Sequence, residues 1–495
     1  MKEKDRIANV VNSKFYPLLL FFVSFVFVTL FSRSTSFLYV YEGGDAAVFK
    51  QMGLALLRGK TLYVDYFDNK GCLLYFIHAL GLWLGGNTAL LIMQAISLTI
   101  TLTIWDRMLA LYRSPRQRWI GLIMALFLLI CFYGAGGQTQ EWSLPFISYP
   151  LLVFLRAYHS KTEIRPTQML AIGVCSGVIT FIQINNACAF LGFVAYLWFQ
   201  CLAKKDFRRL FQSVGIFMAG WLTIAVPCVL YFYVKAGWPG VYEMVYASFL
   251  SNFEYLGSRI PPNPYFPYLY ASFLTLFTVL FVINVRHKKD ILIPTLVSIV
   301  LFVVTFGKLC AIYYLMAFVP LCVVLLTVAD FSRHRKAKVG LCVALALCLS
   351  VCSANLLFHL ANDIVLRKER EVKIYADFHD CLENVPEAER DSIYNYNLHA
   401  TGAAMLFHEG LMPCNRVLFT SLVFVLPSLH KEETSKPFEA PKWIMVSFDK
   451  YFLSDDARFI AARYEWVCSF QHDKLYWDKP RLGENIEIRL YRRKD

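Results

Sequence analysis

Blocks of apolar residues, separated by short polar stretches, make up most of the first 358 residues. Each block is roughly 16–25 residues long, the length that an α-helix needs to cross a bilayer. Because lipid offers no hydrogen-bond partner, backbone groups in such blocks must pair within a helix. The composition agrees, since 57% of the residues are hydrophobic and 17% are charged, against about 25% charged residues in an ordinary soluble domain. We therefore predict a polytopic α-helical membrane protein.

The apolar blocks predict about eleven membrane-spanning helices. The first, residues 15–31, follows Lys2, Lys4, Arg6 and Lys14 and has no clear cleavage site, so we interpret it as a retained helix rather than a signal peptide. The other predicted spans are residues 88–112, 119–134, 142–157, 168–184, 187–203, 210–235, 265–285, 290–306, 308–329 and 339–358.

The loops between these spans alternate in charge, and this alternation predicts the orientation of the chain. Basic residues favour cytoplasmic loops. Because the net charge of +13 lies largely in such loops, it is better explained by membrane orientation than by nucleic-acid binding. We expect a cytoplasmic N-terminus and an extracytoplasmic C-terminus. The basic loops are Arg113–Arg118, Arg156–Arg165, Lys204–Arg209, Arg286–Lys289 and Arg333–Lys338.

Two long loops are predicted on the outer side, at residues 32–87 and 236–264. The first contains two short helical stretches, Asp45–Leu57 and Gly71–Leu84. The second stretch is apolar, but about fourteen residues are too few for a span. Counting it as a span would also reverse every later loop and place the basic loops outside. We therefore expect it to lie along the outer membrane surface.

Charged residues become frequent from residue 359 onward, and the apolar runs shorten. This change predicts two parts, a membrane module at 1–358 and a small extracytoplasmic α/β domain at 359–495. One disulfide is possible among Cys381, Cys414 and Cys468. The predicted strands are Ser392–Leu398, Lys442–Phe448 and Ile486–Tyr491, and the predicted helices are Ala400–Glu409 and Asp455–Tyr464.

Acidic residues stand out in the predicted outer loops. Asp45 begins the first short helix, Asp65 and Asp68 flank an aromatic pair, and Glu141 opens a membrane helix. A carboxylate at such a face is suited to deprotonating an acceptor hydroxyl. Each acid also has a structural interpretation, because acids favour helix N-termini and turns. The residues alone leave both interpretations open.

The order of these residues resembles the first outer loop of C-type glycosyltransferases, a superfamily of polytopic enzymes that includes protein O-mannosyltransferases and lipid A aminoarabinose transferase. The departures are Cys72 in place of an expected proline, Gln138 in place of an asparagine, and Gln183 in place of an arginine. The segments that carry the resemblance are Gly43–Phe49, Tyr63–Gly71, Gly137–Pro145, Gln183–Asn186, and Gly307-Lys308 followed by Tyr313, Tyr314 and Pro320.

The resemblance implies a fold and a reaction. Such enzymes transfer a sugar, with inversion, from a polyprenyl-phosphate donor to an acceptor on the extracytoplasmic face. It implies Asp45 as the base and Glu141 as its support or as a holder of the acceptor. It further implies that Lys308, Lys70 and Arg259 bind the donor phosphate, and that Asp65, Asp68, Asn185, Asn186 and Tyr313 bind substrate.

Several alternatives stay open from the sequence. Lys308 has a second interpretation as an interfacial lysine, and Arg259 as an ordinary loop charge. Asp45, Asp65 and Asp68 have the oxygen ligands that Mg²⁺ or Mn²⁺ prefers, although the resemblance implies no metal requirement. The chain could instead be a transporter or flippase of lipid-linked glycans, or a polymerase or ligase of surface polysaccharide. The acceptor could be a protein, a lipid or a cell-envelope glycan.

Overall fold

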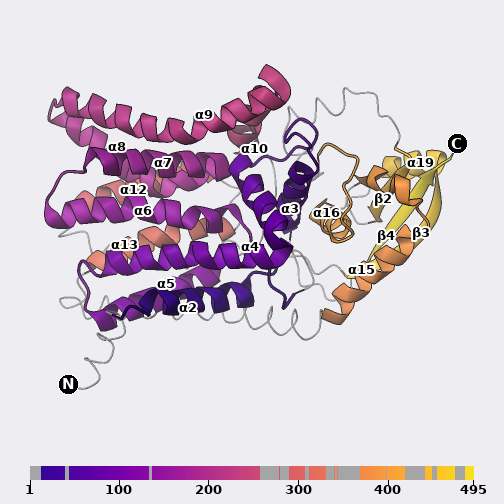
Figure 1. Cartoon of the computed structure of the whole chain (residues 1–495), viewed down its shortest axis with the longest axis horizontal. Coiled ribbons are helices and arrows are strands. Elements are labelled where there is room, and N and C mark those ends of the chain that lie inside the picture. The colour runs from indigo at the N-terminus through magenta and orange to yellow at the C-terminus, as the bar shows by residue number, and fades with distance from the viewer. Residues whose placement is uncertain are drawn as a thin grey trace.

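The computed structural model describes residues 13–39, 44–132, 136–256, 289–306, 312–329, 368–396, 399–417, 441–448, 454–473 and 485–494, with single residues at 278, 339 and 343. Most of the described helices lie side by side in one bundle, and a small sheet lies beyond one end of it (Figure 1). The bundle contains α2 (Tyr16–Phe31), α4 (Cys72–Leu109), α5 (Pro115–Phe132), α6 (Thr139–Ser160), α7 (Pro166–Gln183), α8 (Cys188–Ala203), α9 (Phe207–Val245), α12 (Lys289–Phe306) and α13 (Val319–Val328).

The surface of this bundle suits a membrane. Large apolar side chains such as Val234, Phe211 and Trp83 are mostly exposed, and an aqueous protein rarely leaves many of them uncovered. Three stretches within the described ranges are long and apolar enough to cross a bilayer: Cys72–Leu109, Pro166–Ala203 and Phe207–Glu254. The predicted spans 265–285 and 339–358 lie almost entirely outside the described residues, so the count of about eleven stays a prediction.

A break in α4 separates the predicted surface helix from the next predicted span. Gly85 (φ 157°, ψ 27°) and Gly86 (φ 67°, ψ −142°) leave the helical conformation in the middle of α4. Glycine adopts such angles without the steric cost that a Cβ would bring. The first half of α4 packs against α3 (Gly44–Leu57), the helix predicted at Asp45–Leu57. The position of Gly71–Leu84 along the membrane surface stays a prediction.

The stretch from Pro166 to Ala203 is two helices rather than one. Gln183 is extended (φ −162°, ψ 109°) and is followed by the short 3₁₀-helix η1 (Ile184–Ala187). An unbroken helix of 38 residues would be about 57 Å long, nearly twice the thickness of a bilayer core. Because α7 and α8 both pack against α6 and α9, the break allows two adjacent spans, as the sequence predicts.

The predicted outer loop at 236–264 is helical in its described part, and its place outside the membrane stays a prediction. α9 bends at Gly237 (φ 65°, ψ −157°) and stays helical to Val245. It continues as the π-helix η2 (Tyr246–Leu250) and as α10 (Ser251–Leu256). Pro239, a residue typical of loops, lies two residues after the bend, where the first turn of a helix tolerates proline. The second half of the loop lies outside the described residues.

The C-terminal part of the chain forms a four-stranded sheet with the order β1-β2-β4-β3. Its strands are β1 (Ile393–Tyr396), β2 (Trp443–Phe448), β3 (Tyr464–Asp473) and β4 (Asn485–Arg493), and its helices are α15 (Lys368–Leu382), α16 (His399–His408) and α19 (Ser454–Arg463). The sequence predicted β1, β2, β4, α16 and α19 to within two residues, but it missed β3 and α15. The predicted boundary at 359 lies outside the described residues.

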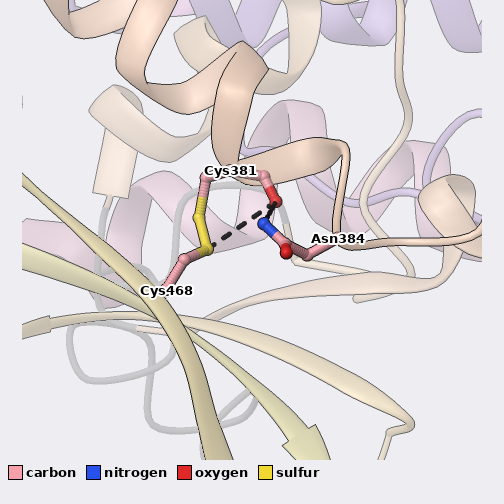
Figure 2. Close-up of a disulfide and its surroundings, with 3 residues drawn as sticks. All are labelled: Cys381, Asn384 and Cys468. Carbon is pink, nitrogen blue, oxygen red and sulfur yellow. Dashed lines mark hydrogen bonds between the residues drawn. A yellow bond between two sulfur atoms is a disulfide. The ribbon is translucent and has the colours of Figure 1, made fainter.

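A disulfide joins Cys381, at the end of α15, to Cys468 in β3 (Figure 2). The side-chain amide of Asn384 donates a hydrogen bond to the Cys381 carbonyl oxygen, 3.1 Å away. Cys414 is a free, exposed thiol. The bond therefore fastens α15 to the sheet, and disulfides are typical of proteins or domains outside the cytoplasm.

Candidate active site

Helix α3 lies at the end of the bundle that faces the sheet (Figure 1). Asp45 lies in the first turn of α3, as predicted. An acid at this position complements the positive end of the helix dipole. Its side chain is half-buried, so it is neither removed from water nor fully hydrated. The next three residues, Ala46, Ala47 and Val48, are buried. They hold the start of α3 firmly in place.

Glu141 is the third residue of α6 and closes a capping box with Gln138. One carboxylate oxygen accepts the Gln138 backbone N–H at 3.2 Å, and the other accepts the Gln94 side-chain amide at 3.1 Å. The Gln94 carbonyl oxygen in turn accepts hydrogen bonds from Ser32 and Thr35. Glu141 as a whole is 7% exposed, so it is buried. This geometry agrees with the structural interpretation of Glu141 that the sequence left open.

The glycines before α6 bring the start of α3 close to this capping box. Gly137 has φ +71°, and a Cβ built on it would lie 3.6 Å from Ala46 Cβ. A Cβ on Gly136 (φ +85°) would overlap Ser32. Both glycines are therefore required by conformation and by close packing. The sequence did not predict that the start of α3 and the glycines before α6 are neighbours, and the tertiary structure shows that they are.

The segment from Tyr63 to Gly71 is held by its own side chains. Asp68 is buried and accepts hydrogen bonds from the Tyr75 hydroxyl and the Asn69 backbone N–H, both at 2.8 Å. Asp65 is exposed and accepts the Thr61 backbone N–H at 2.7 Å. Both acids thus form turns around the aromatic pair, which was the alternative left open by the sequence. Their assignment to substrate binding stays a prediction.

Lys70 is half-buried at the end of this segment. Its ammonium group lies 6.0 Å from the centre of the Phe49 ring of α3 and donates a hydrogen bond to the Asn69 side-chain oxygen at 2.5 Å. The next residue, Gly71, packs so closely on α7 that a Cβ would lie 2.2 Å from the Phe181 carbonyl. Lys70 is therefore fixed between α3 and the end of α7.

The polar residues at the junction of α7 and α8 form a network with α6. Gln183 accepts hydrogen bonds from Thr139 and from the Gln140 amide. Asn186 is fully buried and donates to the Ser143 hydroxyl at 3.0 Å, whereas Asn185 is half-buried. Gln183, which replaces the expected arginine, thus joins α6 to α7. The resemblance did not indicate this bridging role.

The C-terminal part contacts the predicted outer loop directly, a contact that the sequence analysis missed. The guanidinium group of Arg416 donates to the carbonyl oxygens of Tyr63 and Val64 and pairs with Glu243 of α9 at 2.9 Å. It also lies 5.6 Å from the centre of the Phe67 ring. The Phe67 backbone N–H donates to the Arg416 carbonyl at 2.7 Å. One residue therefore joins three distant segments.

Further contacts complete this junction. The Gln51 amide of α3 donates to the Ala403 and Leu411 carbonyl oxygens, at 3.1 and 3.0 Å. The Tyr66 hydroxyl donates to the Pro413 carbonyl at 3.0 Å, and burial raises the pKa of this phenol to about 12. The hydroxyl therefore remains a donor at physiological pH. The residues from Ala403 to Val417, here called the clamp segment, thus pack against α3 and the segment from Tyr63 to Gly71.

Lys50 is another residue that the sequence analysis missed. It lies on α3 with no exposed surface, donates to the Ser34 carbonyl oxygen, and lies 5.5 Å from the centre of the Phe407 ring of α16. A buried lysine is unusual. The available signal was its place in Ala46-Ala47-Val48-Phe49-Lys50, where one basic residue ends an apolar run.

The other predicted phosphate-binding residues, Lys308 and Arg259, lie outside the described residues. Tyr313 is within the short helix η4 (Ile312–Phe318), but its side chain is not among those described. Among the described residues, no three His, Cys, Asp or Glu side chains gather closely enough to hold a metal ion. The site as described therefore consists of Asp45, Glu141, Lys70 and their surroundings.

Solved structures of two glycosyltransferases share the architecture of this chain. ArnT from Cupriavidus metallidurans, the lipid A aminoarabinose transferase, was solved bound to undecaprenyl phosphate. It aligns with 96% of this chain and 98% of its own, with a TM-score of 0.57 and 12% identity. The Archaeoglobus fulgidus oligosaccharyltransferase in the apo form aligns with 97% of this chain and 77% of its own, with a TM-score of 0.52 and 11% identity.

No family model and no curated protein sequence matches the chain. Identities this low say little about individual residues, so these two likenesses concern the fold. They agree with the resemblance that the sequence motifs indicated, because both enzymes are C-type glycosyltransferases. The chain therefore has the fold of the C-type glycosyltransferases.

Proposed function

We propose that this protein is a membrane glycosyltransferase that takes a sugar from a polyprenyl-phosphate donor and transfers it, with inversion, to an acceptor on the extracytoplasmic face. The observation that carries the proposal is the junction of α3, the Gly136–Glu141 loop and Lys70. Asp45 begins α3, and the Lys70 ammonium group lies 6.0 Å from the ring of Phe49 on the same helix. Helix α3 lies at one end of the apolar bundle (Figure 1). The shared fold supports the same conclusion.

Asp45 acts as the base in this proposal. The acceptor hydroxyl attacks the anomeric carbon, and its proton passes to the Asp45 carboxylate. The bond between the anomeric carbon and the phosphate oxygen breaks, and its electrons leave with the lipid phosphate. A base in the correct place contributes about 10²–10⁴-fold to such a reaction. The start of α3 suits this role, because an acid there lies at the positive end of the helix dipole and is half-buried rather than enclosed.

Lys70 supplies positive charge for the leaving phosphate. Fixed cations at a developing negative charge stabilise the transition state most when they need no reorganisation. The stacking of Lys70 near Phe49 and the close contact of Gly71 with Phe181 restrict this lysine before substrate binds. Lys308 and Arg259 are further candidates for the same role. Glu141 supports the site through its capping box or holds the acceptor.

The location outside the cytoplasm has independent support. The disulfide between Cys381 and Cys468 would form readily in an oxidising compartment. The sheet that carries it contacts the candidate site through the clamp segment, so both share one side of the membrane. The polyprenyl donor, the bilayer and a glycan, lipid or protein acceptor are the partners that this function requires.

Asp45→Asn is the test of the proposal, with Asp380→Asn as the matched control. Both changes remove one negative charge, but Asp380 is an exposed residue of α15 that no prediction assigns to the site. We expect Asp45→Asn to lower sugar transfer in membranes by about 10²–10⁴-fold at unchanged protein level, and Asp380→Asn to retain activity. Transfer is measured by mass analysis of envelope glycans. Full transfer by Asp45→Asn would remove Asp45 from the mechanism.

A further inference from the structure

A group of buried polar atoms lies beside the start of α3. Ser34 Oγ and His78 Nε2 both face the bare side of Gly137, because a Cβ built there would lie 3.2 Å from the first and 3.5 Å from the second. The His78 ring packs edge-on to the Trp142 ring, with centroids 6.1 Å apart. The three residues are 2%, 1% and 5% exposed. They come from three different segments of the chain.

Ser34 Oγ, His78 Nε2 and Trp142 Nε1 have no hydrogen-bond partner in the described structure. A buried polar group that lacks a partner costs roughly 1–3 kcal/mol, so native proteins retain few of them. Three such groups in one place are a large cost, and Gly137 contributes no side chain to cover them. The cluster therefore has the properties of a binding subsite rather than of a packed core.

The chemistry of the cluster indicates what it binds. The His78 Nδ1 lies 2.8 Å from the Leu74 carbonyl oxygen. Because a carbonyl only accepts, Nδ1 carries the hydrogen and Nε2 of the neutral ring is an acceptor. The Trp142 indole N–H is a donor, and the Ser34 hydroxyl is both. These donors and acceptors are complementary to hydroxyl groups, which also donate and accept. The buried Lys50 ammonium group borders the cluster, because it donates to the Ser34 carbonyl oxygen.

The cluster also lies next to both acids of the candidate site. Gly137 contacts Ala46, the neighbour of Asp45, and Trp142 follows Glu141. A cavity of about 20 Å³ also lies against Trp142, Glu141 and Gln94, and its other walls are mostly apolar side chains such as Val28 and Leu98. Of the three cluster residues, only Trp142 lines this cavity.

We propose that Ser34, His78 and Trp142 form a subsite for the hydroxyl groups of a sugar ring, supplied by the donor or by the acceptor. The subsite rests on the proposed transferase function. It predicts an unusual pattern for variants that remove the polar atoms. Replacing a buried, unpaired polar atom by an apolar one leaves the folded protein equally stable or more stable, while sugar binding is lost.

The variants are Ser34→Ala, Trp142→Phe and His78→Phe in the full-length protein. Trp198→Phe is the matched control, because the Trp198 indole N–H also has no partner but lies on α8 against Phe217. Thermal unfolding measures stability. Native mass spectrometry measures binding of bare undecaprenyl phosphate and of a cell lipid extract that contains polyprenyl-phosphate sugars. Envelope-glycan analysis measures transfer.

We expect the three variants to keep their melting temperatures and their binding of bare undecaprenyl phosphate. We expect each to lose about fivefold to tenfold in a sugar-dependent step, whereas Trp198→Phe loses nothing. If a variant no longer binds polyprenyl-phosphate sugars more tightly than bare undecaprenyl phosphate, the subsite binds a hydroxyl of the donor sugar. If that preference is kept but transfer falls, the subsite binds a hydroxyl of the acceptor.

Two results would overturn the proposed subsite but not the proposed function, provided that the protein still binds bare undecaprenyl phosphate. One is unchanged binding and unchanged transfer in all three variants. The other is a melting temperature lowered by several degrees in Ser34→Ala and Trp142→Phe, which would mean that these atoms serve the fold. A wild-type protein that binds no polyprenyl phosphate and transfers no sugar would instead overturn the proposed function, and the subsite with it.

Discussion

Single residues in this protein often serve the fold and the proposed chemistry at the same place. Asp68 illustrates this, because it was a substrate-binding candidate and its carboxylate accepts hydrogen bonds from Tyr75 and Asn69. Glu141 is a second case, since its two oxygens are occupied by Gln138 and Gln94. A carboxylate whose two oxygens already accept hydrogen bonds from fixed donors is poorly placed to take a proton from an acceptor hydroxyl. We therefore expect Glu141 to position the site rather than to move a proton.

Substitution of Glu141 tests this assignment. Glu141→Gln keeps one acceptor oxygen of the same reach, whereas Glu141→Ala leaves the Gln138 N–H and the Gln94 amide without their acceptor. We expect the alanine variant to lose about 1–3 kcal/mol of unfolding free energy and the glutamine variant less, by thermal unfolding. We also expect Glu141→Gln to transfer sugar within about tenfold of wild type. A folded Glu141→Gln variant as inactive as Asp45→Asn would contradict the positioning role.

At the scale of elements, the outer end of the bundle is assembled from pieces distant in sequence. α3, the segment from Tyr63 to Gly71, the outer part of α9 and the clamp segment share one apolar cluster, which includes Phe67, Val241, Met412 and Val417. Arg416 adds polar contacts to the same junction. The C-terminal part therefore packs directly against the segments that carry the candidate site residues.

A double-mutant cycle on Arg416 and Glu243 measures this junction. The pair is 17% and 24% exposed, so we expect a coupling free energy of about 0.5–3 kcal/mol. We also expect reduced sugar transfer in Arg416→Gln, because the segment before Lys70 loses an anchor. The matched pair is Arg209 and Glu163, which is 37% and 75% exposed and should couple by about 1 kcal/mol or less. Equal coupling in both pairs, with full transfer by Arg416→Gln, would mean that the junction is dispensable.

At the scale of the whole molecule, the fold separates a membrane bundle from a disulfide-bonded sheet at one end (Figure 1). The orientation in the membrane is predicted from basic loops such as Arg113–Arg118 and is consistent with the disulfide. Both arguments place the sheet outside. They are independent, because one rests on charge and the other on redox environment.

Cysteine labelling of intact cells tests the orientation. Single cysteines are introduced at Ser114 and at Ala462, both exposed, in a Cys414→Ser background, because Cys414 is the exposed free thiol among the described cysteines. We expect a membrane-impermeant maleimide to label Ala462→Cys and to leave Ser114→Cys unlabelled until the cells are opened. Labelling of Ser114→Cys in intact cells would show that Gly71–Leu84 is a true span and that the orientation is reversed.

The sequence by itself determined the features that depend on local interactions. Apolar length predicted the helices, and the motif around Asp45 predicted the helix that carries it to within one residue. It missed β3 because the residues Tyr464–Asp473 lack a clear alternation of apolar and polar side chains, and pairing with β4 stabilises that strand.

Only the tertiary structure decided which of these segments meet. Contacts between residues hundreds of positions apart, such as Gln51 with Ala403 or Phe67 with Arg416, leave no periodic signal in either segment. The approach of Gly137 to Ala46 is likewise a matter of packing between segments, and the positive φ angles of Gly136 and Gly137 shape the turn that makes it. The start of α3 that carries Asp45 was therefore predictable, whereas its surroundings, with Arg416 and the Ser34, His78 and Trp142 cluster, were not.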